Sequence, residues 1–186
     1  MPHHENVLAA SVVQSYRHLF RQGPDQDPVL DLACGGGRNG LHLLEHNVPV
    51  IFLDNNQESI AALNDRITRS GKSSMASVVD KDLEKKGEDP LEGLQVQGII
   101  VCNYLHRPLV PAIKRATPPG GVVIYETFTV GQASLGRPRN PEFLLREDEL
   151  ETWFNEWEII HKFQGLVDNP RRAIANLVAR KPQDIH

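Results

Sequence analysis

The stretch Val29-Leu30-Asp31-Leu32-Ala33-Cys34-Gly35-Gly36-Gly37-Arg38-Asn39-Gly40 decides how the first half of this chain folds. Its first four residues form a short apolar run that enters a glycine cluster, which predicts a β-strand followed by a sharp turn. A helix is expected to begin near Gly37, with Leu41 and Leu44 on its apolar side. The exposed backbone amides at the start of such a helix favour a negatively charged group, such as a phosphate or a carboxylate.

The segments around this stretch alternate between helical and extended patterns, which is typical of an α/β fold. Apolar residues at helical spacing predict a first helix from Glu5 to Phe20. Further strands are expected at residues 48–53, 75–79, 98–102, 122–125, 157–167 and 172–180. Further helices are expected from Asn55 or Asn56 to Gly71, at residues 110–116 and at about residues 146–154. Asn55 and Glu58 fit an N-terminal capping pair for the helix that Gly71 should end.

The connection between the last two strands is too short for a helical crossover, so these strands should pair antiparallel. We therefore expect a doubly wound, seven-stranded, mostly parallel sheet whose last strand is antiparallel. Residues 1–186 are expected to form a single domain, because this length is ordinary for one domain and long enough to bury a core. Residues 131–141, rich in glycine, proline and arginine, are expected to form a loop.

The composition, with 40% hydrophobic and 24% charged residues, is that of a globular protein, and the formal net charge is −4. DNA is therefore not the expected partner, since duplex binding usually needs a basic excess. Two cysteines make no disulfide framework, and no apolar run suggests a signal peptide or a membrane span, so we expect a cytoplasmic protein that needs no membrane. His3 and His4 could suggest a metal site, but an exposed terminal pair is the simpler interpretation, and no metal is expected.

Three glycines and an acid in this region indicate a nucleotide-type ligand. Gly35, Gly37 and Gly40 follow a predicted strand in the spacing G-x-G-x-x-G, and Asp54 ends the next strand 17 residues after Gly37. An acid in that place can accept hydrogen bonds from ribose hydroxyls. By itself this pattern also fits a nicotinamide-dinucleotide enzyme, and a tight turn without any ligand is a further alternative.

Asp31, four residues before Gly35, separates these alternatives. The pattern Asp31-x-Ala33-x-Gly35-x-Gly37 resembles the first motif of class I methyltransferases that depend on S-adenosylmethionine (SAM). The helix expected before the first strand and the antiparallel end of the sheet also resemble that family. The Gly37-Arg38-Asn39 step, the size and the final strand are similar to the small tellurite-resistance type. The resemblance implies SAM as cofactor and S-adenosylhomocysteine as product, with Asp31 helping to hold the methionine part.

The resemblance also implies where the rest of the cofactor lies. Asp54 corresponds to the ribose-binding acid, and Asp82 with Leu83 to the adenine edge, with Asp80 as an alternative two residues away. The sequence Cys102-Asn103-Tyr104 corresponds to the motif beside the methyl group. The expected cofactor-binding residues are Asp31, Ala33, Cys34, Gly35, Gly37, Asn39, Asp54, Asn55, Asp82, Leu83, Cys102 and Asn103. Cys34 and Cys102 are expected to act as small packing residues rather than in redox chemistry.

The carboxyl ends of the fourth and fifth strands should present the residues for catalysis. His106 is the best candidate base, since histidine ordinarily titrates near neutral pH, and Glu126 could be its partner or an alternative base. His106 could instead cap the helix that follows, and Glu126 could be a solvated strand end. A soft nucleophile such as a thiolate needs little help from a base, whereas a hydroxyl or a protonated amine needs one.

Three residues are candidates for contact with the substrate. Tyr104 follows the fourth strand, and Arg137 and Arg139 in an Arg-Pro-Arg sequence could clamp a carboxylate or phosphate, or simply be solvated. The chain lacks an Asn-Pro-Pro-Tyr motif, which disfavours the amino groups of DNA bases and glutamine side chains as acceptors. Because the chain leaves little material for a substrate domain, we expect methyl transfer to a small molecule. An RNA or protein acceptor, a SAM-binding protein without catalysis and an oxidoreductase are the alternatives, and the oligomeric state stays open.

Overall fold

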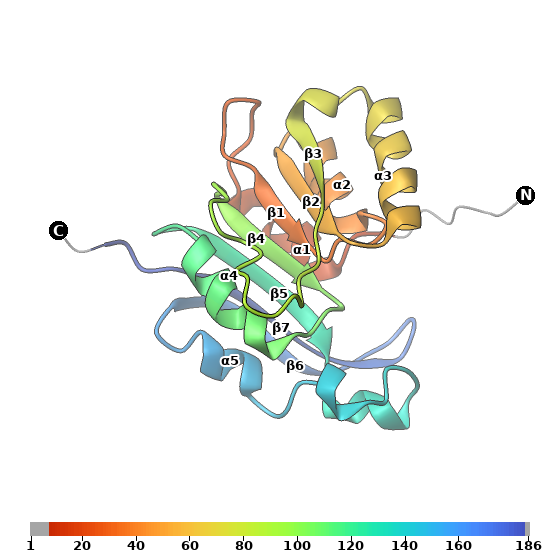
Figure 1. Cartoon of the computed structure of the whole chain (residues 1–186). Coiled ribbons are helices and arrows are strands. Elements are labelled where there is room, and N and C mark those ends of the chain that lie inside the picture. Colours follow the sequence, from red (N-terminus) through yellow and green to blue (C-terminus); the bar gives the residue numbers. More distant parts are fainter. Residues whose placement is uncertain (1–7, 185–186) are drawn as a thin grey trace, which may run out of the picture.

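A seven-stranded sheet forms the centre of the computed structural model, which describes residues 8–184 (Figure 1). The strands are β1 (Val29–Leu32), β2 (Val50–Asp54), β3 (Ala76–Asp80), β4 (Gly98–Cys102), β5 (Val122–Phe128), β6 (Glu158–Val167) and β7 (Arg172–Arg180). They lie in the order β3-β2-β1-β4-β5-β7-β6. Only β7 runs against the others, since it pairs antiparallel with both β5 and β6. The expected fold class is therefore confirmed, including its antiparallel last strand.

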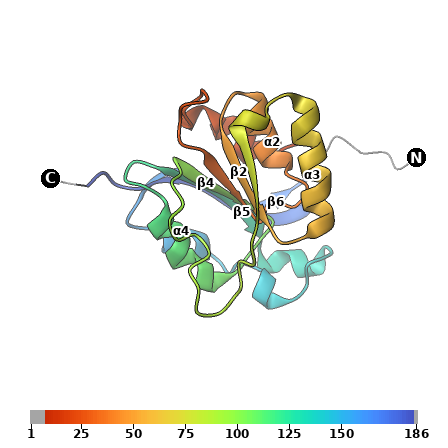
Figure 2. The ribbon, with the colours of Figure 1, turned by 45° about the horizontal axis from the view of Figure 1, so that its top comes forward.

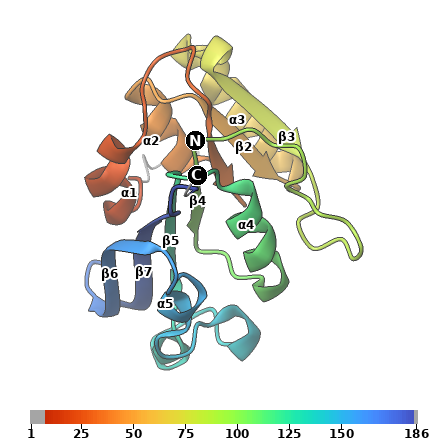
Figure 3. The same ribbon diagram turned by 90° about the vertical axis from the view of Figure 1, so that its left-hand side faces the viewer.

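Helices cover both faces of this sheet, as Figures 2 and 3 show. The α-helices are α1 (Ser11–Tyr16), α2 (Arg38–Glu45), α3 (Gln57–Ser70), α4 (Val110–Ala116) and α5 (Glu149–Trp153). The apolar sides of α1, α2 and α3 join one buried cluster, and those of α4 and α5 join the other. Residues 81–97 between β3 and β4 contain no helix, and their Leu83, Leu91 and Val96 pack into the same cluster as α4 and α5 instead.

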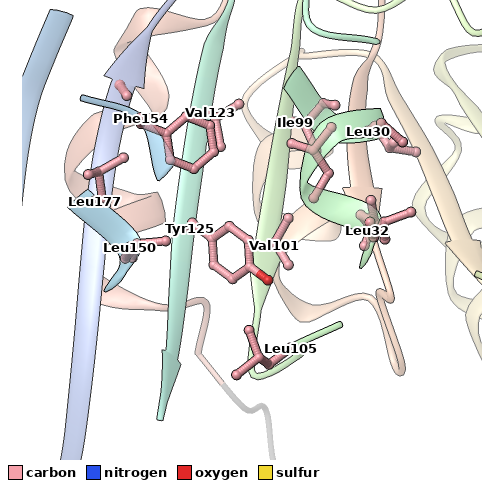
Figure 4. Close-up of a cluster of buried hydrophobic side chains, with 14 of the residues drawn as sticks. Leu30, Leu32, Ile99, Val101, Leu105, Val123, Tyr125, Leu150, Phe154 and Leu177 are labelled. Carbon is pink, nitrogen blue, oxygen red and sulfur yellow. The ribbon is translucent and has the colours of Figure 1, made fainter. Parts of the chain in front are cut away.

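Strand β4 shows why the sheet is buried on both faces. All five of its residues are buried. Alternate side chains of a strand point to opposite faces, so Ile99 and Val101 join one cluster while Ile100 and Cys102 join the other. Figure 4 shows the first of these clusters, in which Tyr125 of β5 lies beside Val101. Continuous apolar runs of this kind are typical of central parallel strands.

In the first half of the chain, two helix starts differ from the sequence-based expectation. The described part of the first helix begins at Ser11, because Ala10 before it has a non-helical backbone with a ψ of 137°. The Ala10 amide donates to Asn39 Oδ1 at 2.9 Å. The expected start at Glu5 lies outside the described residues, as do His3 and His4. Helix α3 is capped by Asn56 and not by Asn55, since Asn56 Oδ1 accepts the Ser59 amide at 2.9 Å. Its end at Gly71 is confirmed.

The segment after β5 is also more ordered than expected. The predicted loop 131–141 contains most of a short 3₁₀ helix, Val130–Ser134, and the first residue of another, Pro141–Phe143. Helix α5 begins at Glu149 rather than at Arg146, because the Glu149 carboxylate accepts the Arg146 amide at 2.9 Å and so folds the chain back before the helix. Within residues 8–184, none of the helices is long and apolar enough to cross a membrane.

Candidate functional site

The glycines of the turn between β1 and α2 have two different roles: one faces open space and two pack against the core. Gly35 has a φ of +51°, and a Cβ added there would meet no atom within 4 Å, so its backbone faces open space. Gly37, with a φ of +73°, faces inward, and an added Cβ would lie 2.5 Å from Leu63 Cδ1. A Cβ on Gly40 would collide with the Phe52 ring. Gly35 therefore admits a ligand, while the other two glycines let α2 pack closely on the sheet.

A first hollow opens at this turn and has a volume of about 410 Å³. We call it the glycine hollow; it is lined by Asp31, Ala33, Cys34, Gly35, Gly36, Arg38, Asn39, Arg66, Cys102 and Asn103. A second one, the acid hollow, has a volume of about 520 Å³ and is lined by Ala33, Asp54, Asn55, Lys81, Asp82, Leu83, Glu84, Asn103 and Tyr104. Ala33 and Asn103 belong to both, so the two hollows adjoin along the carboxyl ends of the strands.

Every residue expected to bind cofactor, except Gly37, lines one of these two hollows. Gly36 lines the glycine hollow in its place. The sequence pattern could not separate the two neighbours, because only the packing of Gly37 against Leu63 and Phe52 shows that it faces the core.

The wall shared by the two hollows has a strained backbone. Ala33 follows β1 with a φ of +53°, and Asn103 follows β4 with a φ of +57°. Left-handed backbone is unfavourable for residues other than glycine, and it tends to cluster at functional sites. Here both strained residues stand at the ends of neighbouring strands, at the point where the hollows meet. This position marks the strand ends as the functional edge of the sheet.

Asp31 lies at the floor of the glycine hollow with only 2% of its surface exposed. One carboxylate oxygen accepts the Gly40 amide at 2.8 Å. Burial raises the pKa of Asp31 from 3.8 to about 7, although the Gly40 hydrogen bond and the nearby Arg38 oppose the rise. A cation placed beside this carboxylate would therefore be strongly favoured.

Asp54 ties the end of β2 to the glycine turn. One of its oxygens accepts the Gly35 amide at 2.7 Å, and the other accepts the amides of Asn55 and Asn56 at 2.8 and 2.9 Å. An ionised carboxylate has about four acceptor positions, so one remains for a ligand hydroxyl.

Asp82 is better placed than Asp80 to reach a ligand. Asp82 lines the acid hollow. The exposed Asp80 instead accepts the Gln57 side chain at 2.6 Å, and it does not line that hollow. Of the two acids that the sequence offers for the adenine edge, the positions therefore favour Asp82 over Asp80.

A third hollow, the apolar hollow, adjoins the acid hollow and has a volume of about 300 Å³. It is lined by Glu84, Asn103, Tyr104, Leu105, Thr127, Phe128, Pro138 and Phe143. Tyr104 lines both hollows, and its backbone carbonyl accepts the hydroxyl of the buried Tyr125 at 3.0 Å. The candidate substrate residue Tyr104 is thus held where two hollows meet.

The two candidate bases lie apart from one another. His106 lines a further hollow beside α4, which shares Leu83 and Glu84 with the acid hollow, and its Nδ1 is 3.9 Å from Glu84 Oε2. Glu126 is 4% exposed and accepts the Asn176 side chain at 3.1 Å, and it lines none of the hollows described above. The structure therefore brings His106 to Glu84, not to Glu126.

Arg137 and Arg139 are exposed and line none of these hollows. Only Pro138 between them reaches the apolar hollow, while the Arg137 carbonyl accepts the Gln132 side chain at 3.0 Å. A charge clamp formed by the two arginines stays a prediction without a contact to support it.

Three charged residues that the sequence analysis does not predict line the hollows. Arg38 and Arg66 line the glycine hollow, and Glu84 lines both the acid and the apolar hollow. The position of Arg38 beside the glycine turn was the available signal, since helix starts often hold charged ligands. Arg66 and Glu84 reach the site only through the packing of α3 and the 81–97 loop, and no local pattern marks them.

Arg107 organises the outer wall of the apolar hollow. Its guanidinium binds both oxygens of Glu149 at 2.6 and 2.9 Å and donates to the carbonyls of Glu142 and Leu144, each at 2.9 Å. These carbonyls flank Phe143, which lines the hollow. Arg107 thereby fixes a wall that lies far from it in sequence.

The two cysteines, Cys34 and Cys102, line the glycine hollow. Burial, reinforced by nearby carboxylates, raises the pKa of both Cys34 and Cys102, so neither is an activated nucleophile. Among residues 8–184, no group of three or more histidine, cysteine or acidic side chains is arranged to hold a metal ion.

Comparison with known proteins now places the chain in a family. Residues 24–173 match the family model described as tellurite resistance protein TehB. The chain belongs to the TehB family. A curated relative, named probable S-adenosyl-L-methionine-dependent methyltransferase TehB, from Haemophilus influenzae, is 27% identical over 82% of this chain. The chain spans 57% of the length of that TehB relative.

Solved structures agree with the fold. The crystal structure of TehB from Haemophilus influenzae aligns with a TM-score of 0.71 and 23% identity, covering 91% of this chain and 61% of that one. A SAM-dependent methyltransferase from Methanosarcina mazei aligns with a TM-score of 0.70 and 13% identity, covering 96% of this chain and all of the other. At these identities the likeness shows the fold alone, which is Rossmann-like.

Proposed function

We propose that this TehB-family chain is an enzyme that transfers a methyl group from SAM to a small molecule. The observation that carries the proposal is the joining of the glycine and acid hollows at Ala33 and Asn103, because together they suit a ligand with an amino-acid end and a nucleoside end. The name of the curated TehB relative supports the same cofactor. The apolar hollow beside them provides room for an acceptor.

The glycine hollow has the charges that an amino acid requires. Asp31 is placed to receive an ammonium group, and Arg38 and Arg66 are placed to attract a carboxylate. The open backbone at Gly35 allows close approach. We propose that this hollow holds the methionine part of SAM, with Cys34, Asn39 and Cys102 as neutral neighbours.

The acid hollow suits the adenosine part. Asp54 keeps a free acceptor position for a ribose hydroxyl, and Asn55 lies beside it. We propose that Asp82 accepts from the adenine amino group while Leu83 packs against the ring. Gly37 supports this arrangement from the core side, by letting α2 begin where it does.

When bound, SAM supplies an electrophilic methyl group on a sulfonium, and the chain contributes mainly position and alignment. Asn103 borders all three hollows and so lies between cofactor and acceptor. Tyr104 is proposed to contact the acceptor. His106 stays a proposed base that would act through Glu84. Glu126 stays a proposed base as well, but it is buried beside Cys102 on the neighbouring strand and lines none of the three hollows.

Proteins with this fold catalyse different reactions, so the experiment below also distinguishes other functions. A solved structure named as the [4+2]-cyclase SpnF aligns with a TM-score of 0.71 at 15% identity. RNA or protein as acceptor, and SAM binding without catalysis, are the other outcomes considered. The cytoplasm is proposed as the location, consistent with two unpaired cysteines.

Thermal shift measurements test the proposal directly. SAM and S-adenosylhomocysteine should each stabilise the protein, whereas NADH should not. Stabilisation by NADH alone would overturn the proposal. Asp54→Ala should weaken binding by about 100-fold, on the order of 3 kcal/mol, because it removes a charge-assisted acceptor inside the acid hollow.

Asp80→Ala is the matched control, since Asp80 ends the neighbouring strand yet does not line the hollow. The Asp80→Ala variant should bind SAM and S-adenosylhomocysteine with wild-type affinity. Asp54→Asn serves if the alanine variant fails to fold, because its amide oxygen can still accept some of the backbone amides. Incubating radiolabelled SAM with fractionated cell extract would then identify the methylated class of molecule; label only in RNA or protein would contradict a small-molecule acceptor.

A further inference from the structure

We infer that the acceptor is an amine with an apolar body, and that Glu84 selects it by its charge. The inference rests on the proposed function, since it names the substrate class of the same site. Its starting point is the composition of the apolar hollow. Apolar side chains form most of the wall, and Glu84 is the only charged residue among those that line it.

The carboxylate of Glu84 is held at the hollow from two sides. Oε1 accepts the Tyr104 hydroxyl at 3.2 Å, and Oε2 lies 3.9 Å from His106 Nδ1. The Glu84 side chain is 55% exposed, so a ligand can still reach it. A carboxylate fixed in this way next to an apolar wall matches an organic ammonium group, which it can bind through a charge-assisted hydrogen bond.

Among the described residues that line the apolar hollow, there is no lysine or arginine to pair with Glu84. Arg107 is bound to both oxygens of Glu149. Arg137 and Arg139 are exposed and do not line the hollow, and Lys85 pairs with Glu88 at 2.6 Å. Lys81 faces the acid hollow. An anionic acceptor would therefore meet a carboxylate without a compensating positive side chain.

The position of Glu84 also suits the chemistry of an amine. A protonated amine has no free electron pair, so one proton must leave before the nitrogen can attack. Glu84 can take this proton, and His106 beside it can pass the proton to water. The nitrogen then forms a bond to the methyl carbon while the carbon–sulfur bond of SAM breaks and its electron pair stays on sulfur. One ammonium and SAM thus give one methylammonium, S-adenosylhomocysteine and one proton.

Tyr104 is a positioning residue in this scheme, because its hydroxyl orients the Glu84 carboxylate. Leu105, Phe128 and Phe143 supply the apolar surface for the body of the amine. At about 300 Å³ the hollow lies at the lower end of ligand-binding clefts, which favours a compact acceptor.

Binding to the complex with S-adenosylhomocysteine tests the inference. The probes are phenethylamine, its neutral counterpart phenethyl alcohol, the anion phenylacetate, and tellurite. Phenethylamine should bind at least tenfold more tightly than each of the others. Preferential binding of phenylacetate or tellurite would overturn the inference, and so would the absence of any binding by phenethylamine.

Glu84→Gln should weaken phenethylamine binding about tenfold while S-adenosylhomocysteine still stabilises the protein. Glu92→Gln, in the same loop but lining none of the hollows, is the matched control and should behave as the wild type. Tyr104→Phe should raise the KM for the amine severalfold and leave the affinity for S-adenosylhomocysteine unchanged. Unchanged amine binding in Glu84→Gln would overturn the role of Glu84.

Turnover provides a second readout. Labelled methyl should appear on nitrogen, and the rate should rise with pH more steeply in Glu84→Gln than in the wild type, because the variant depends on amine that has already lost its proton in solution. If S-adenosylhomocysteine fails to stabilise even the wild type, the proposed function itself is wrong. If it stabilises the protein and the amine still does not bind, only the inference about the acceptor is wrong.

Discussion

The two ends of the strand-end site are built in different ways. Around β1 and β2, a short continuous turn and the next strand supply nearly everything, as when the Asp54 carboxylate accepts the Gly35 amide. Around β4 and β5, the apolar hollow needs Glu84 from one loop, Phe143 from another and Arg107 to hold the second in place. A local motif can specify the first end, whereas the second exists only after the chain has folded.

The first prediction tests the packing at the end of the site around β1 and β2. Gly40→Ala would place a methyl group against the Phe52 ring and 2.8 Å from an Asp31 oxygen, inside a fully buried region. We expect a loss of about 2 kcal/mol in the free energy of unfolding, since overpacking outweighs the helix preference of alanine. Chemical denaturation measures it.

Gly36→Ala is the control for this change, because a Cβ there would meet no atom within 4 Å. It should alter the free energy of unfolding by less than about 0.5 kcal/mol. Equal effects of the two substitutions would contradict the division between ligand-facing and core-facing glycines.

This contrast also explains what the sequence could predict. The strands around the glycine turn, Asp54 at the end of β2 and the antiparallel β7 follow from periodicity, spacing and connection length, and the structure agrees. Asn56 replaced Asn55 as helix cap because the Asp54 carboxylate binds both of their amides and delays the helix by one residue. Such a detail depends on side-chain geometry that a one-dimensional pattern does not contain.

The other end was harder to predict for a physical reason. The sequence predicts substrate contacts for Arg137 and Arg139 because their loop follows β5, yet both residues are exposed to solvent. Arg107 was not selected, although it contacts Glu149, 42 positions away, and fixes the wall of the hollow. Contacts at such separation leave no periodicity or spacing in the sequence.

The second prediction concerns how stability and ligand binding at Asp31 depend on pH. Because burial raises the pKa of Asp31 to about 7, the folded protein holds a proton there that the unfolded chain would release above 3.8. The contribution of Asp31 to stability is therefore full below pH 3.8 and is lost as the pH rises to about 7. Binding of an ammonium group needs the ionised carboxylate and should have the opposite trend.

We thus expect the affinity for S-adenosylhomocysteine to increase with pH from 5.5 to 7, by up to about tenfold per pH unit, and then to level off. Calorimetry in buffers of different ionisation enthalpy would show proton release on binding. Asp31→Asn should bind more weakly and with a flat pH profile over this range. A profile as steep as that of the wild type would assign the titration to another group.

The third prediction has the smallest expected effect and concerns the apolar hollow around β4 and β5. Arg107→Lys keeps the charge but cannot form the two-pronged contact with Glu149 together with both carbonyl bonds. The acceptor KM should rise about fivefold, near 1 kcal/mol, with S-adenosylhomocysteine affinity unchanged. Lys114→Arg is the control: Lys114 lies in the last turn of α4, donates to the Trp153 carbonyl and lines none of the hollows, so this variant should leave the acceptor KM as it is. A change in cofactor affinity of the same size would show that the two ends are coupled.

The left-handed backbone at Ala33 and Asn103 has a consequence for how this chain can change over time. Each such residue costs on the order of 1–3 kcal/mol relative to a relaxed backbone, and both border the glycine and acid hollows. Selection for heat resistance alone would favour glycine at these two positions, and the shared wall would then lose its fixed shape. A laboratory lineage kept under thermal selection without a demand for ligand binding should accumulate changes there first.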